Sequence, residues 1–316
     1  MTFYTQLLSL EARSGVRRGV DIITALILGL LFSAGSCLAQ DNSQGRYRPE
    51  GRLAGLAAGR EFNESPYEVR TYEPVATPDA FDNAMVFYPL TLSFDPPNGA
   101  VAFMPGYQAS AAAYEWWGPT LASLGYSVFI LETNSPTDSL AARTDALKAT
   151  VEFIKAENRN MESPVANKID PEKIALIGHS MGGSAALRAA LELGDTIKAV
   201  IPLALYCCEP GESFSGDYSN ISASALVIAS SADEVAVPAE HARLVYESIG
   251  SSKIYIEFAD GDHAFVSNSG VEKATLGRFV LAFLKATLDD RLNLGDVLSN
   301  PSEEYMEKFS HYETAL

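Results

Sequence analysis

Short apolar runs alternate with amphipathic stretches along the chain from residue 67 onward. A short run rich in Val, Ile, Phe and Tyr is typical of a buried strand, and apolar positions three or four residues apart are typical of a helix. The predicted strands are 67–72, 85–92, 101–105, 126–132, 174–177, 197–205, 225–230 and 253–258. The predicted helices are 112–124, 139–158, 184–193, a helix that begins near Pro238, and 275–288. This alternation predicts an α/β protein with a mostly parallel sheet and helices on both faces.

The first 39 residues follow the order of a secretory signal peptide, with arginines, the apolar run 22–32 and then small residues. The apolar run is too short to predict a membrane span, so no stable membrane insertion is expected. Cleavage after Ala39 predicts a secreted protein, extracellular or periplasmic. The alternative is a lipoprotein anchored through Cys37, because residues 34–37 resemble a loose bacterial lipobox.

Three further segments follow this signal. Residues 40–66 are polar and rich in Gly and Arg, which predicts a flexible leader. The alternating strands and helices occupy residues 67–289 and predict one α/β domain without a large lid, because no obvious long lid insertion interrupts the elements. Residues 290–316 read as a polar tail with one short helical run at 301–312.

The chain is acidic, with 40 Asp and Glu against 23 Lys and Arg and a formal net charge of −17. Nucleic acid is therefore not expected as a partner, because binding it needs a basic surface. The charge disfavours polyanionic substrates and leaves neutral ones unaffected. No His and carboxylate spacing of the zinc type is present, so no cofactor is expected; a structural calcium ion on the acidic surface stays open. The protein is expected to be a monomer.

Two adjacent cysteines, Cys207 and Cys208, follow the predicted strand 197–205. Adjacent cysteines rarely bridge each other, because the ring that they would close is strained. No separated partner exists for a conventional disulfide framework outside the signal segment. Both are predicted to be small buried thiols.

A Gly-His-Ser-Met-Gly-Gly run at residues 178–183 directly follows the apolar run 174–177 and precedes an Ala- and Leu-rich helical stretch. This G-x-S-x-G pattern between a strand and a helix predicts a strained turn that exposes Ser180 at the carboxyl edge of the sheet. Glycines on both sides remove the Cβ atoms that would collide in such a turn. Ser180 is therefore a candidate nucleophile.

A nucleophilic serine needs a histidine base, and the base needs an acid that orients it. His263 lies directly beyond the predicted strand 253–258 and so at the same edge as the serine, whereas His241 falls in a predicted helix, where such a histidine is more often on the surface. Asp233 lies just past the strand 225–230, which makes it the predicted acid, with Glu234 as the second choice. The order Ser, Asp, His is the order that α/β-hydrolases use.

The oxyanion that forms on attack needs two N–H donors already in place. One predicted donor is the amide of Met181, at the start of the helix that follows the serine. The other is the amide of Tyr107, in the Pro105-Gly-Tyr-Gln108 loop after an early buried strand.

Residues 66–289 resemble the bacterial cutinase and poly(ethylene terephthalate) hydrolase family, a branch of the α/β-hydrolases related to dienelactone hydrolases. The segments that carry this resemblance occur in the same order as in that family; they are Pro105-Gly-Tyr107, Trp116-Trp-Gly-Pro119, Thr133-Asn134 with Asp138 and Arg143, the 178–183 run, 233–238 and Asn268-Ser-Gly270. The resemblance implies a secreted serine esterase with an open cleft.

The resemblance also implies roles for residues beside the triad. Tyr107 and Tyr206 would clamp an acyl group of the substrate, and His179 would line the pocket beside the serine. Asp138 and Arg143 would brace the fold. Three features depart from the family pattern: no cysteine lies beyond Cys208 to form the family's C-terminal disulfide, the Cys207-Cys208 pair after Tyr206 is unusual, and the tail after residue 289 has no counterpart.

Three functions remain in view at this point. The preferred hypothesis is an esterase that hydrolyses polyesters through Ser180, His263 and Asp233. The second is a lipase or small-ester carboxylesterase with the same residues, and the sequence separates this function poorly from the first. The third is a non-catalytic binding protein on a hydrolase fold, which predicts a lost triad residue, and none is lost.

Overall fold

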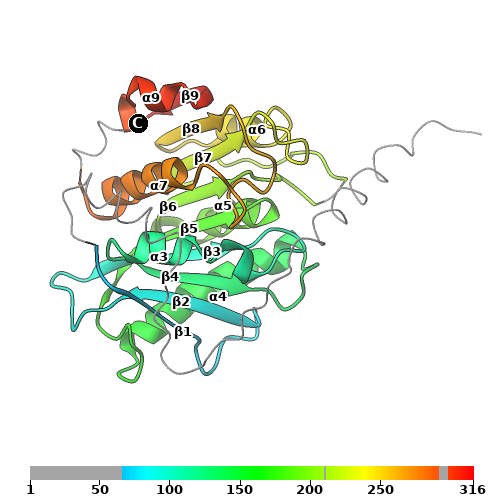
Figure 1. Ribbon diagram of the computed structural model, residues 1–316. Helices are drawn as coiled ribbons and strands as arrows, with labels where there is room; N and C mark the ends of the chain where they lie inside the picture. The colour runs from blue at the N-terminus through cyan, green and yellow to red at the C-terminus, as the bar shows by residue number, and fades with distance from the viewer. Residues whose placement is uncertain (1–65, 210, 292–297) are drawn as a thin grey trace, which may run out of the picture. The chain divides into compact units, whose positions relative to one another are not determined.

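The computed structural model describes residues 66–209, 211–291 and 298–316, and within them one sheet of nine strands is formed in the order β1-β2-β4-β3-β5-β6-β7-β8-β9 (Figure 1). The six central strands, β4, β3, β5, β6, β7 and β8, run parallel to one another. The outer strands pair antiparallel with their neighbours: β1 with β2 and β2 with β4 at one edge, and β9 with β8 at the other. The bounds are β1 Val69–Tyr72, β2 Asn83–Pro89, β3 Asn98–Met104, β4 Ser127–Glu132, β5 Ile169–His179, β6 Ile197–Leu203, β7 Ser224–Ser230, β8 Lys253–Phe258 and β9 Phe309–Ala315.

Helices cover both faces of the sheet. The helices are η2 Ala111–Tyr114, α3 Trp117–Ala122, α4 Leu140–Arg159, α5 Met181–Leu193, η3 Gly194–Thr196, α6 Ala242–Ser248, α7 Lys273–Leu288 and α9 Glu303–Met306. Side chains of α3 and α7 belong to the apolar core on one face, and side chains of α4, α5 and α6 belong to the core on the other. The prediction of a mostly parallel, two-faced sheet is therefore confirmed.

The central strands are buried on both faces, which explains why their sequences read as continuous apolar runs. In β7, every residue after Ser224 is buried, and in β3 every residue after Asn98 is. Helix α4 begins where Ser139 caps it, because the Ser139 side chain accepts a hydrogen bond from the Ala142 amide at 3.2 Å. These local signals place the predicted elements within a few residues of the observed ones.

The predicted helix at 112–124 is in fact two short elements, η2 and α3, separated at Glu115 and Trp116. The break sets both tryptophan rings against the 263–270 segment, because the indole N–H groups of Trp116 and Trp117 both donate to the Val266 carbonyl at 3.0 Å. The apolar spacing along the sequence does not report such a contact with a distant loop.

The prediction for the tail is wrong in part, since the helical run expected at 301–312 is limited to α9 and is followed by strand β9. Strand β9 pairs antiparallel with β8 and so covers an edge of the sheet that would otherwise present unpaired backbone groups. The Phe309 ring contacts Phe258 and Phe279 with centroid distances of 5.1 and 5.2 Å. Strand β9 therefore belongs to the α/β domain.

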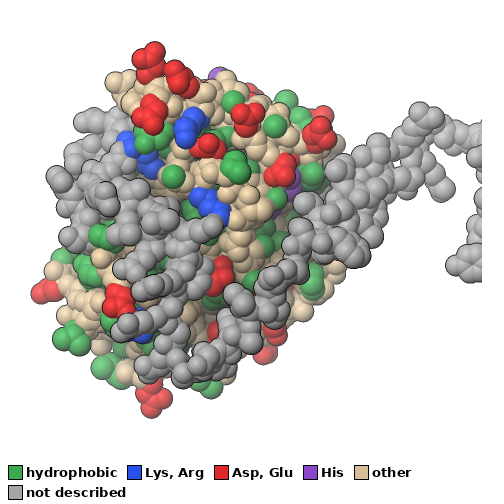
Figure 2. All heavy atoms as spheres, viewed as in Figure 1, with side chains coloured by type: hydrophobic (Ala, Val, Ile, Leu, Met, Phe, Trp, Pro, Cys, Tyr) green, Lys and Arg blue, Asp and Glu red, His purple; other side chains and the backbone are tan. Residues whose placement is uncertain are grey.

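The predicted signal peptide (1–39) and almost all of the predicted leader (40–66) lie outside the described residues. Among the described residues, no helix has the length and apolarity that crossing a bilayer requires. Figure 2 shows acidic side chains spread over the face that it draws, with fewer basic ones between them, in agreement with the acidic sequence.

Candidate active site

Ser180 lies in the turn between β5 and α5 with a positive φ of 54° and a ψ of −123°. A non-glycine residue rarely adopts this conformation, and it persists only where the surroundings enforce it. The turn is tight, since a Cβ on Gly178 would overlap the backbone of Gly182, and a Cβ on Gly182 would overlap the carbonyl oxygens of Met104 and Pro105. Both glycines are therefore required by close backbone contact, and the turn has the expected geometry.

Three side chains form a continuous hydrogen-bonded chain at this turn. The Ser180 Oγ lies 2.9 Å from Nε2 of His263, and Nδ1 of His263 lies 2.7 Å from Oδ2 of Asp233. Because an ionised carboxylate only accepts hydrogen bonds, Nδ1 carries the proton and Nε2 is left to accept the serine proton. Ser180 is 8% exposed and Asp233 3% exposed, so the chain is largely shielded from water but reachable at the serine.

The carboxylate of Asp233 is held from both sides. Its Oδ1 accepts from the amides of Val235 and Ala236 at 2.9 and 2.8 Å, while Oδ2 accepts from His263. Burial by itself would raise the pKa of Asp233, but the hydrogen bond and charge of His263 and the two amides outweigh it and hold the pKa below its usual value. Asp233 therefore stays ionised and keeps the imidazole in one orientation.

Glu234 and His311 lie outside this hydrogen-bonded chain. Glu234 is exposed, although it adjoins Asp233. His311 lies on the edge strand β9, where its Nε2 is 3.3 Å from a Glu313 carboxylate oxygen. The structure thus brings together the three residues that the sequence proposed as a triad and leaves the second choice, Glu234, outside.

The loop that follows β3 lies directly against the serine. A Cβ on Gly106 would come 3.1 Å from the Ser180 Cβ, which places the neighbouring Tyr107 beside the nucleophile. Met181 is the first residue of α5, and amides in the first turn of a helix have no acceptor within the helix. The two predicted oxyanion donors thus lie on the two segments that border Ser180.

A buried arginine holds this loop. The guanidinium of Arg143 is fully buried and donates to the backbone carbonyls of Pro105, Pro136 and Asp138 at 3.0, 2.9 and 3.1 Å. Burial lowers the pKa of Arg143, which the nearby Asp138 partly offsets. The resemblance implied that Asp138 and Arg143 brace the fold, and Arg143 does so by binding backbone carbonyls. One of these carbonyls belongs to Pro105, the residue before Gly106.

His179, beside the serine in sequence, is 6% exposed and has partners at both ring nitrogens. Its Nδ1 lies 2.6 Å from the Tyr114 hydroxyl, and its Nε2 lies 2.8 Å from the backbone carbonyl of His263. Burial, followed by the charge of His263, lowers the pKa of His179 to about 3. His179 is therefore a neutral side chain inside the protein wall, and the expected substrate contact stays a prediction.

This low pKa predicts a loss of stability in acid. An unfolded histidine binds its proton below about pH 6.5, whereas folded His179 does not until about pH 3, so lowering the pH favours the unfolded chain. One such group costs about 1.4 kcal/mol per pH unit below pH 6.5. In urea unfolding at pH 7 and pH 5, the free energy of unfolding of the wild type should therefore fall by about 2 kcal/mol more than that of His179→Gln. Equal falls in the two proteins would contradict the buried neutral state.

Tyr206, the second predicted clamp residue, is partly exposed near the start of the segment that follows β6. Its ring packs against the His241 ring in a tilted arrangement, with the centroids 4.2 Å apart and an interplanar angle of 34°. His241 was expected on the surface, and this expectation is wrong: the residue precedes α6, is 7% exposed, and its Nδ1 accepts from the Cys207 amide at 3.3 Å. The helical pattern misled because the helix begins only after His241.

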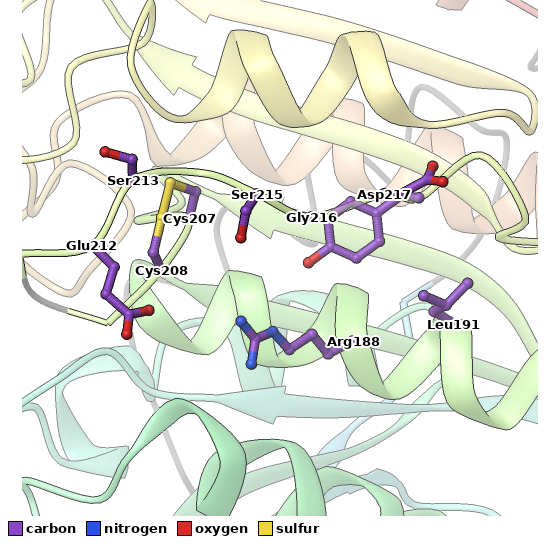
Figure 3. Close-up of a pocket in the computed structure, with 10 residues that line it drawn as sticks. Arg188, Leu191, Cys207, Cys208, Glu212, Ser213, Ser215, Gly216 and Asp217 are labelled. Carbon is purple, nitrogen blue, oxygen red and sulfur yellow. A yellow bond between two sulfur atoms is a disulfide. The ribbon is translucent and has the colours of Figure 1, made fainter.

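Cys207 and Cys208 are buried, as expected, but they form a disulfide with each other instead of two thiols. They lie in the irregular segment after β6, where the backbone bends, and not in a strand that would turn neighbouring side chains to opposite faces. Together with Arg188 and Tyr218 they line a pocket of about 260 Å³ between α5 and the segment after β6 (Figure 3). This pocket is lined by none of the triad residues.

Tyr114 is the residue of the site that the sequence did not reveal. The sequence pattern places it only as one position of the predicted helix 112–124, yet its hydroxyl lies 2.6 Å from His179 Nδ1, and the Gly106 amide donates to that hydroxyl at 3.4 Å. No local signal marks this tyrosine, because its partners lie on two other segments of the chain. Among the described residues, no group of three or more His, Cys, Asp or Glu side chains could hold a metal ion, so no residues can be assigned to the calcium ion left open above.

The strained serine turn after β5, with an acid after β7 and a histidine after β8 along one edge of a mostly parallel sheet, defines an α/β-hydrolase. The chain belongs to the PET hydrolase-like family, which matches residues 43–315. The resemblance seen in the sequence is thereby confirmed, and with it the class of carboxylic ester hydrolases.

Curated relatives agree with this placement. A bis(hydroxyethyl) terephthalate hydrolase of Streptomyces coelicolor is 30% identical over 87% of this chain and 84% of its own length. A cutinase of Thermobifida alba is 31% identical over 67% of each chain. A lipase of a Moraxella species is 30% identical over 68% of this chain and 63% of its own length.

Proposed function

We propose that this protein is a serine esterase that hydrolyses the carboxylic ester bonds of polyesters. The observation that carries the proposal is the hydrogen-bonded chain from Ser180 through His263 to Asp233 at a strained turn. Membership of the PET hydrolase-like family supports the substrate class, as do the relatives named for cutinase and terephthalate ester hydrolysis.

In this proposal the reaction has two halves. Ser180 Oγ attacks the ester carbonyl carbon while its proton passes to His263 Nε2, and the Tyr107 and Met181 amides stabilise the oxyanion. The tetrahedral intermediate expels the alcohol, which takes the proton from His263 and leaves an acyl group on Ser180. Water then attacks this acyl group with His263 as base, and the carboxylic acid leaves. Asp233 orients the imidazole and stabilises its charged form throughout.

A second candidate is a lipase or small-ester esterase with the same machinery, which the similarity to the Moraxella lipase supports. The long connection between β6 and β7, residues 204–223, lines a pocket against α5 that contains none of the triad residues, and the segments bordering Ser180 are the turn after β5 and the loop after β3. A site without a long covering insertion suits a bulky or polymeric ester better than one that needs a closed tunnel. We therefore favour polyesters.

Secretion is part of the same proposal, because an insoluble polymer can be reached only outside the cell. The order of arginines, apolar residues and small residues in 1–39 supports export, either as a free protein after cleavage at Ala39 or as a lipoprotein through Cys37.

Tyr206 provides a test of the substrate class. We expect Tyr206→Ala to lower kcat/KM on an aromatic diester by about tenfold or more, since the loss of an aromatic contact near 1.4 kcal/mol is a factor of ten in rate. Hydrolysis of p-nitrophenyl acetate should stay within a few-fold, because so short an acyl group cannot reach across the cleft. The measurement is kcat/KM on both esters.

The matched control is Tyr206→Phe, which keeps the ring that packs against His241. It should behave like the wild type on both esters. Equal losses on both esters in Tyr206→Ala would show that Tyr206 supports the fold and does not contact the substrate.

A further inference from the structure

A second hydrogen-bonded chain runs behind the triad. It begins at the Gly106 amide, which donates to the Tyr114 hydroxyl at 3.4 Å, and continues from that hydroxyl to His179 Nδ1 at 2.6 Å. It ends where His179 Nε2 meets the backbone carbonyl of His263 at 2.8 Å. The chain therefore connects the loop of the predicted oxyanion donor to the loop of the predicted base.

The donors and acceptors along this chain fit only one arrangement. The His263 carbonyl can only accept, so His179 carries its proton on Nε2 and presents Nδ1 as an acceptor. The Tyr114 hydroxyl must then donate to Nδ1, which leaves its lone pairs for the Gly106 amide. A neutral His179 is needed for this arrangement, since a charged ring would present two donors, and burial of His179 keeps it neutral.

We infer that Tyr114 and His179 are positioning residues: they hold the Gly106–Tyr107 segment and His263 in fixed positions relative to Ser180. This inference rests on the proposed esterase function. Tyr114 is 2% exposed, so it acts through the two loops and not by touching the substrate.

The distances explain why this coupling matters for the reaction. A Cβ on Gly106 would come within 3.1 Å of the Ser180 Cβ, and the His263 ring lies 4.7 Å from the His179 ring, centroid to centroid. The same loops must present an amide to the oxyanion and Nε2 to the serine hydroxyl. A misplacement of about 1 Å at such a site can cost about a hundredfold in rate. Because Tyr114 and His179 are buried, water cannot readily replace a lost partner.

The test is Tyr114→Phe, which removes one hydroxyl and keeps the ring. We expect kcat to fall by about tenfold to a hundredfold with little change in KM, since positioning acts mainly on the transition state. The fall should be the same on p-nitrophenyl acetate and on an aromatic diester, because the affected groups act on every ester. Steady-state kinetics on both esters give this comparison.

The matched control is Tyr126→Phe. Tyr126 is 1% exposed and its hydroxyl donates to Asp289 at 3.0 Å, so this variant also loses a hydrogen bond of a buried tyrosine but lies outside the site. It should keep wild-type kcat. His179→Gln and His179→Leu form the second pair: the glutamine amide can donate to the His263 carbonyl and accept from Tyr114, so it should retain far more activity than the leucine.

Two kinetic results would overturn the inference: wild-type kcat in Tyr114→Phe, or a loss confined to the aromatic diester with a raised KM. The second result would make the pair part of the substrate pocket. A wild type that hydrolyses neither ester would instead contradict the proposed function. The coupling is then decided by ¹⁵N NMR of labelled histidine, in which Tyr114→Phe should shift the resonances of both His179 and His263; a shift of His179 alone would overturn it.

Discussion

Replacing Ser180 by alanine should lower kcat for ester hydrolysis by about a million-fold, the loss typical of removing the nucleophile of such a triad. The reason is chemical, because the methyl group of alanine cannot form an acyl-enzyme and His263 loses the hydroxyl that lies 2.9 Å from its Nε2. The residual rate comes from the oxyanion donors and substrate binding alone. The measurement is turnover of a p-nitrophenyl ester by the purified variant.

The fold of this variant should be unchanged, since the Ser180 hydroxyl is not part of either apolar core. Circular dichroism and the melting temperature serve as the control. Retention of more than about a thousandth of the wild-type turnover would count against Ser180 as the nucleophile, because that exceeds the background expected of such sites.

Asp233→Asn should be the second most damaging change, with a loss of about ten-thousand-fold in kcat. An amide at this position can donate to His263 Nδ1, which places the ring proton on Nε2, where it faces Ser180 and blocks proton acceptance. The fold should tolerate the change, because the amide oxygen can still accept from Val235 and Ala236 as Oδ1 does now. The measurement is kcat on p-nitrophenyl acetate.

Glu234→Gln is the matched control, because Glu234 is the next residue along the chain but is exposed. It should keep wild-type kcat. If Glu234→Gln were the more damaging of the two, the acid of the triad would be misassigned.

The parallel sheet and the three residues on its edge could be predicted because their signals are local. Strand β7 is a continuous apolar run that ends just before Asp233, and the turn around Ser180 needs small residues at fixed positions. The carboxyl ends of parallel strands lie at the same edge of a sheet, so residues that directly follow such strands gather at that edge. Ser180, Asp233 and His263 follow β5, β7 and β8 in this way.

The features that the sequence did not reveal depend on distant contacts. Strand β9 forms by pairing with the open edge of β8, and the polar sequence of the tail gives no sign of this pairing. Tyr114 acquires its place from Gly106 and His179, and His241 is buried by Tyr206 and Cys207. The Cys207–Cys208 disulfide likewise depends on the bend of the backbone after β6 and not on the spacing of the cysteines.

The most direct test of the central claim is the release of aromatic acid from an insoluble polyester film, followed by liquid chromatography for the wild type and for Ser180→Ala. We expect steady release by the wild type and release no greater than that of buffer by the variant. Equal release by both proteins, or no release by a wild type that readily hydrolyses p-nitrophenyl acetate, would contradict a polyester hydrolase that works through Ser180.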